Sequence, residues 1–127
     1  MHFMLIYDDS PDFIERRPQF RDEHLTLAWQ AAAAGELLLA GALEEPTEQA
    51  FLLFKGPTSK GAERFAKADP YVRHGLVKRW RVKQWNTVVG EFAASSLRPG
   101  VKAKCRPTSV RAEIQRSADA ETSFSLD

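Results

Sequence analysis

The stretch Arg21-Asp22-Glu23-His24-Leu25 lies inside the longest helical pattern of the chain, which runs from about residue 20 to residue 34 and stops at Gly35. Positions 20, 24, 27, 31 and 34 share one stripe at helical spacing, and they read Phe, His, Leu, Ala and Ala. His24 therefore occupies a position that the pattern otherwise gives to apolar side chains. Spacing alone leaves two interpretations open, a core or boundary histidine with one satisfied nitrogen or a functional imidazole.

Glycine, proline and serine residues set the expected ends of the helices. Gly35 is expected to end the long helix in the left-handed conformation. Because proline disfavours helix at the residue before it, we expect this helix to begin at or just after Pro18, with residues 13–17 as a separate short helical piece. A second helix is expected from a Ser59 cap to Ala68. Its buried residues are expected to be Ala62, Phe65 and Ala66.

The remaining regular segments are expected to be strands. The first is apolar on both faces, and the second is short, apolar and interrupted by a glycine, so both are expected to be buried. The last alternates in part, with Trp80 and Val82 on one face and basic residues on the other. The four predicted strands are residues 2–8, 37–43, 50–55 and 77–85.

The order strand, helix, strand, strand, helix, strand defines the fold class. Two βαβ-like halves with both helices on one face form an α+β, ferredoxin-like βαββαβ sandwich. Since the first strands are apolar on both faces, the open face of the sheet is expected to meet a second copy. The prediction is a homodimer that closes into a dimeric α+β barrel.

Composition excludes several classes of protein. The 127 residues are enough for one domain, and the net charge of +1 creates no field that would attract nucleic acid or an anionic membrane. No apolar run approaches the length of a transmembrane helix, and the first residues lack the basic start of a signal peptide. We therefore expect a cytoplasmic protein with no nucleic-acid or membrane partner. The single cysteine, Cys105, excludes an internal disulfide.

The composition changes after Gly90. Residues 91–127 contain six serines, six Lys or Arg, five Asp or Glu, and only a weak apolar stripe near Val110 and Ile114. Such a segment has too little apolar surface to form a core of its own. We expect a folded domain over residues 1–90 and a flexible C-terminal extension over residues 91–127.

The sequence Ala68-Asp69-Pro70-Tyr71 closes the second predicted helix. Asp69 can accept hydrogen bonds from the free amides of the next helical turn, and Pro70 suits the first position of that turn. A capping role would explain the Asp-Pro pair without any catalysis. Spacing alone does not separate this role from a functional one.

Several motifs in register resemble the YciI family, also described as the YCII-related domain, over residues 1 to about 86. The motifs are a first strand ending in Ile-Tyr, Arg21-x-x-His24-Leu25, Leu38-Leu39-Ala40-Gly41, Ala68-Asp69-Pro70-Tyr71, and Gly75. The stretch between the second and third strands is short for the family, and the segment after Gly90 has no counterpart in it. The chain lacks the Asp-Gly-Pro-Phe motif of the wider superfamily, which favours the YciI branch.

The resemblance implies a ferredoxin-like homodimer with a histidine and an aspartate in an active-site cleft, here His24 and Asp69. A carboxylate bonded to one imidazole nitrogen fixes the tautomer and leaves the other nitrogen for acid or base work. Arg21, one turn before the histidine, could hold an anionic substrate group or be a solvated surface residue. Tyr7 and Tyr71 could line the cleft or serve only in packing. No metal or other cofactor is expected, since the histidines show no ligand spacing.

Two functions are compatible with these residues. The first is a small cofactor-independent enzyme in which the pair moves a proton on a small, aromatic or quinone-like substrate. The resemblance points to lyase-like chemistry such as dehydrochlorination, or to an isomerase-like reaction. The second is a non-catalytic dimer that binds a small ligand or acts as an accessory or regulatory subunit.

Overall fold

The computed structural model describes residues 1–100. The chain divides into a unit spanning Met1–Asn86 and a unit that begins at Thr87. Predictions about Cys105, Val110 and Ile114 lie outside the described residues. In chain order, the elements of the first unit are β1 (His2–Asp9), α1 (Phe13–Ala33), β2 (Leu37–Ala42), β3 (Gln49–Lys55), α2 (Lys60–Ala68), α3 (Pro70–Arg73) and β4 (Val77–Trp85).

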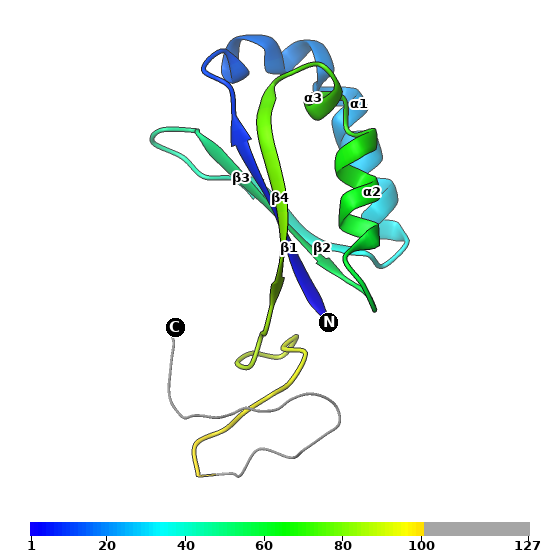
Figure 1. The fold of residues 1–127 in the computed structure, drawn as a ribbon, viewed down its shortest axis with the longest axis vertical. Coiled ribbons are helices and arrows are strands. Elements are labelled where there is room, and N and C mark those ends of the chain that lie inside the picture. The colour runs from blue at the N-terminus through cyan, green and yellow to red at the C-terminus, as the bar shows by residue number, and fades with distance from the viewer. Residues whose placement is uncertain (101–127) are drawn as a thin grey trace. The chain divides into compact units, whose positions relative to one another are not determined.

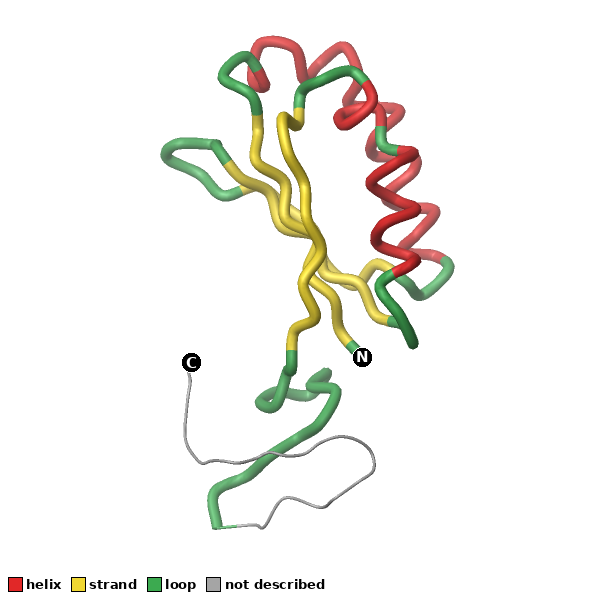
Figure 2. Tube along the Cα trace, in the orientation of Figure 1, coloured by secondary structure: helices red, strands yellow, loops and turns green. Residues whose placement is uncertain are grey.

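The four strands form one sheet in the order β2-β3-β1-β4, and every neighbouring pair is antiparallel. The first strand is therefore central, between β3 and β4, although it begins the chain. Figure 1 shows α1 and α2 on the same side of this sheet, and Figure 2 shows the opposite side free of helices. This arrangement confirms the predicted ferredoxin-like α+β fold.

The core lies between the helices and the sheet. Leu5 of β1 is fully buried and pairs in register with Leu52 and Val82 of the neighbouring strands. Side chains of a strand alternate between faces, so every second residue of each strand faces the helices. From α2, Ala62, Phe65 and Ala66 complete this layer, as predicted.

The predicted start of the long helix was wrong. Helix α1 begins at Phe13 and continues through Pro18 without a second start. Proline removes one amide donor, but the first turn is held independently because Phe13 is only 4% exposed and packs edge-on against Tyr71, with ring centroids 5.3 Å apart. Packing of the first turn therefore outweighs the local cost of the proline. The predicted end is confirmed, since Gly35 has φ +80°.

Two smaller predictions also fail. Strand β2 was expected to be buried, but only Leu37 of its six residues is, because β2 is an edge strand with a partner on one side only. Ser59 stands at the N-cap of α2 without capping its amides; its hydroxyl donates instead to Oε2 of Glu63, 2.7 Å away. A hydrogen bond to the first amide of α2 comes instead from the neighbouring Thr58, whose Oγ1 accepts from the amide of Lys60 at 3.3 Å.

The second unit is described from Thr87 to Gly100 and contains no helix or strand in that range. Its turns are held by local bonds, such as that from the amide of Ala94 to Oγ1 of Thr87 at 2.8 Å. None of the helices in the described part of the chain is long and apolar enough to cross a membrane.

We propose that residues 1–90 fold without the segment that follows them. A chain ending at Gly90 should keep its melting temperature to within about 2 °C of the full-length protein, because that segment has too little apolar surface to form a core. Differential scanning calorimetry of the two chains measures this directly. A drop of about 8 °C or more would show that the segment packs on the domain.

Candidate functional site

Asp69 connects α2 to α3 and is completely buried, with 0% exposure. Its backbone is extended, with φ −69° and ψ 125°, which ends α2 and lets Pro70 begin the next turn. Its Oδ1 accepts a hydrogen bond from the amide of Tyr71 at 3.0 Å. The predicted capping role is therefore confirmed, and it leaves the second carboxylate oxygen free for other donors.

His24 lies on α1 and contacts the carboxylate of Asp69 from this separate helix. Its Nδ1 lies 2.9 Å from Oδ1 and 3.0 Å from Oδ2 of Asp69. The imidazole also stacks on the ring of Tyr71, with centroids 4.0 Å apart and planes 12° apart. The side chain of His24 is 15% exposed, so the contact joins a fully buried carboxyl group to a partly exposed imidazole. The contact that the sequence motifs imply is thus present; its role in function stays a prediction.

Tyr7, near the end of β1, contributes the third side chain on Asp69. Its hydroxyl donates to Oδ2 of Asp69 at 2.7 Å, and the residue is only 2% exposed. Burial, followed by the negative charge of Asp69, raises the pKa of Tyr7 far above its usual range. The phenol is therefore a permanent donor at all physiological pH values. Its predicted contact with a ligand remains untested.

Tyr71 stacks on the imidazole of His24 and packs against Phe13, and two arginines lie close enough to act on its hydroxyl. It is 5% exposed, and burial raises its pKa although the charges of Arg17 and Arg21 act in the opposite direction. The guanidinium of Arg17 stands 5.7 Å from the ring centroid of Phe13. Arg21 is exposed, which suits either of the two roles that the sequence left open.

Sequence reasoning did not include Arg17, although a signal was available. Residues 17, 21 and 24 fall on one helical stripe at spacings of four and three, so two arginines precede the histidine on the same face. The expected break at Pro18 assigned Arg17 to a separate short helical piece. The continuous helix α1 is what joins this arginine to the candidate site.

Asp9 is a second buried acid that sequence reasoning missed. It is 5% exposed, and among the described residues it alone has buried side-chain oxygens without a hydrogen-bond partner. Burial, followed by the charge of Asp8, raises the pKa of Asp9 to about 6, while Arg17 opposes the shift. Its charge also raises the pKa values of Tyr7 and Tyr71, which places it near the site. An acid two residues beyond Tyr7 on the same strand was the available signal.

Its neighbour Asp8 faces the other side of the sheet and is fully paired. It accepts from Nε2 of Gln49 at 2.9 Å, from Nε of Arg79 at 3.0 Å and from a terminal guanidinium nitrogen of Arg81 at 2.8 Å. These bonds, led by that from Gln49, hold the pKa of Asp8 well below its usual range. The two adjacent carboxylates therefore have opposite electrostatic environments.

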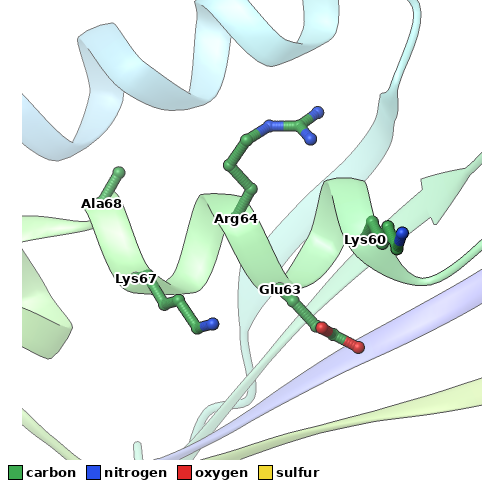
Figure 3. A pocket seen from close by; sticks show the side chains of 5 residues that line it. All are labelled: Lys60, Glu63, Arg64, Lys67 and Ala68. Carbon is green, nitrogen blue, oxygen red and sulfur yellow. The ribbon is translucent and has the colours of Figure 1, made fainter.

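Neither of two surface hollows formed by residues 1–100 is lined by His24 or Asp69. One, of about 400 Å³, lies along α2 (Figure 3) and is lined by Lys60, Glu63, Arg64, Lys67 and Ala68. The other, of about 560 Å³, follows exposed residues of α1 around Trp29. No group of three or more His, Cys, Asp or Glu side chains within residues 1–100 is arranged to hold a metal ion.

A ferredoxin-like sheet with a histidine of α1 held on an aspartate between α2 and α3 defines the class of protein. The model of the YCII-related domain matches residues 1–86, and the chain belongs to that family. An uncharacterized protein of Haemophilus influenzae is 29% identical over 97 residues, covering 69% of this chain and 99% of its own. The expected family membership is thereby confirmed.

A solved structure shares the fold. It is 5-chloro-2-hydroxyhydroquinone dehydrochlorinase, TftG, from Burkholderia phenoliruptrix AC1100, in complex with 2,5-dihydroxybenzoquinone. The TM-score is 0.59 at 19% identity, and the match covers 68% of this chain and 95% of that one. At this level of identity the similarity establishes the fold alone.

The unpaired carboxyl of Asp9 predicts an unusual dependence of stability on pH. The pKa of Asp9 is about 6 in the folded state, above the ordinary value of 3.8, so the folded state binds more protons than the unfolded state between these two pH values. Stability from this group is therefore complete below about pH 4 and falls as the pH rises toward 6. Asp9→Asn should raise the free energy of unfolding by about 1–2 kcal/mol at pH 7.5, and by little at pH 4.

Urea denaturation at both pH values measures this difference. Asp8→Asn serves as the matched control, because the pKa of Asp8 is lowered in the folded state. Asp8 therefore stabilises the fold at pH values above its pKa in the unfolded state, and this stabilisation is lost as the pH falls. The control should therefore be destabilised at pH 7.5. An Asp9→Asn protein that is less stable than the parent at pH 7.5 would contradict the prediction.

Proposed function

We propose that the protein is a small cofactor-independent enzyme in which His24 acts as an acid and base on a small hydroxylated aromatic or quinone-like molecule. The observation that carries this proposal is the contact between Nδ1 of His24 and the fully buried carboxylate of Asp69 at 2.9 Å. With Nδ1 engaged there, Nε2 is the nitrogen left to exchange a proton with a ligand.

Burial of Asp69 favours this use of the imidazole. A carboxylate without contact with water and held by three donors keeps its position while the ring gains or loses a proton. When Nε2 takes a proton from a ligand hydroxyl or an acidic carbon, the positive charge forms directly beside the anion. Return of this proton to another atom of the ligand gives an isomer. In a dehydrochlorination the C–Cl bond breaks instead, chloride leaves and the proton passes from Nε2 to solvent, so that HCl is lost in total and no oxidant is needed.

The surroundings of the imidazole favour a flat, electron-rich ligand. The aromatic rings of Tyr71 and Phe13 stand behind the imidazole, and the cations Arg17 and Arg21 lie close enough to affect Tyr71. These cations would stabilise the negative oxygen that forms when a hydroxylated ring loses a proton. The dehydrochlorinase with the same fold, solved with a dihydroxybenzoquinone bound, is an example of this ligand class.

The test uses 2,5-dihydroxybenzoquinone as a binding probe and chloride release from 5-chloro-2-hydroxyhydroquinone as the activity assay. His24→Gln should lower the turnover by roughly 100-fold or more, because it removes the proton-transfer group. Asp69→Asn should lower turnover less, since Asn still caps α3 but provides no charge beside the imidazole. Isothermal titration calorimetry and a chloride electrode provide the two measurements.

The matched control is His74→Gln, which removes an imidazole that stacks on Phe20, with centroids 4.4 Å apart, and lies outside the pair. It should keep both binding and turnover. If the probe binds and no chloride is released by the wild-type protein, the protein is a binder of such ligands and not a dehydrochlorinase. Equal turnover in wild type and His24→Gln would refute the catalytic role.

We further propose that the protein is a homodimer joined through the open face of the sheet. Met4 and Ile6 of β1 face away from the helices, and they pair in register with Leu53 and Phe51 of β3. Leu39 of the edge strand extends this apolar surface and is 73% exposed. An apolar sheet face of this kind is normally covered by a second layer.

Light scattering at micromolar concentration should report twice 14.3 kDa. Leu39→Lys should shift the mass toward that of the monomer, because a charge in an apolar interface costs several kcal/mol unless it is paired. Trp29→Lys, which changes an equally exposed residue of α1, should remain dimeric. A wild-type monomer at this concentration would exclude the dimer.

A further inference from the structure

The carboxylate of Asp69 depends on three donors, and each plays a different part. The amide of Tyr71 holds Oδ1 at 3.0 Å and the hydroxyl of Tyr7 holds Oδ2 at 2.7 Å. His24 faces both oxygens through Nδ1, at 2.9 and 3.0 Å. Because Asp69 is 0% exposed, these groups replace the water that would otherwise solvate its charge.

The position of Tyr7 makes it a rigid donor. It lies on the central strand β1, in register with Ala50 of β3 and Trp80 of β4, and is 2% exposed. The charged groups that affect its phenol are Asp69 and Asp9, and both disfavour its ionisation. The hydroxyl therefore remains protonated and donates to Asp69.

We propose that Tyr7 is a positioning residue that completes a Tyr7–Asp69–His24 triad and sets the protonation equilibrium of His24 through the charge of Asp69. The proposal rests on the proposed function for its catalytic consequence only. The hydroxyl fixes the carboxylate with both oxygens toward Nδ1, and it disperses part of the negative charge. The imidazole therefore meets a weaker anion than it would without Tyr7.

Removal of the hydroxyl has a defined consequence. In Tyr7→Phe, the ring still fills its place in the core, but Asp69 keeps only two of its three donors. A buried carboxylate with fewer donors gains more from a positive charge next to it. His24 should therefore retain its proton to higher pH, and the protonated imidazole partly compensates for the missing hydrogen bond.

The experiment is an NMR titration of His24 in the full-length protein without ligand. Tyr7→Phe should raise the protonation midpoint of His24 by about half a pH unit or more, relative to wild type. Tyr71→Phe is the matched control, because it also removes one phenolic hydroxyl beside the imidazole but keeps the stacked ring and the amide bond to Asp69. In this control, the protonation midpoint of His24 should stay within about 0.2 pH units of the wild-type value.

A double-mutant cycle shows whether Asp69 carries the effect. In the Asp69→Asn background, Tyr7→Phe should no longer move the midpoint, because the charge through which the hydroxyl acts is absent. A Tyr7→Phe midpoint that is unchanged or lower, or a shift that persists in the Asp69→Asn background, would overturn the proposal. Because the titration is done without ligand, its result is independent of the binding and activity assays. The triad proposal can therefore fail while the probe still binds, and the proposed enzyme activity can fail while the His24 titration shows the expected shift.

Discussion

The site depends on a negative charge that the fold keeps entirely out of water. Asp69 is 0% exposed, and an unpaired carboxylate at such a position would be protonated or would destabilise the fold. The chain avoids both outcomes by directing a backbone amide, a phenol and an imidazole at its two oxygens. These donors come from α3, β1 and α1, so a single side chain couples the sheet to both helical segments.

This coupling gives one carboxylate two contacts, a helix cap and the imidazole of His24. As a cap, Asp69 ends α2 and begins α3 through the amide of Tyr71, and this role needs only one oxygen. The second oxygen is bonded by Tyr7, and the imidazole of His24 lies across both. The cap and the contact with the imidazole are compatible, because one carboxylate oxygen can accept from both the amide of Tyr71 and Nδ1 of His24.

Asp8 and Asp9 show how strongly a sheet separates neighbouring residues. On the open face, Asp8 is bonded by Gln49 and two arginines, which favour its charged form. On the helix face, Asp9 has no hydrogen-bond partner for its oxygens, and burial favours its neutral form. Successive side chains of a strand point to opposite faces, so two adjacent identical residues meet different partners and acquire opposite charge preferences.

The sequence by itself determined the fold class, and its resemblance to the YciI family singled out the two central residues of the candidate site. Hydrophobic periodicity, glycine and the Asp-Pro pair are local signals, and they predicted the order of elements, Gly35 at φ +80° and the cap at Asp69. Only the tertiary structure decided what depends on contacts between distant segments. Packing of Phe13 on Tyr71 stabilises the first turn of α1, so the helix begins before Pro18 and continues past it. Strand β2 lies at the edge of the sheet, and most of its residues are therefore exposed. The bond from Tyr7 to Asp69 spans 62 positions in sequence, and only the assembled sheet and helices bring its two atoms together.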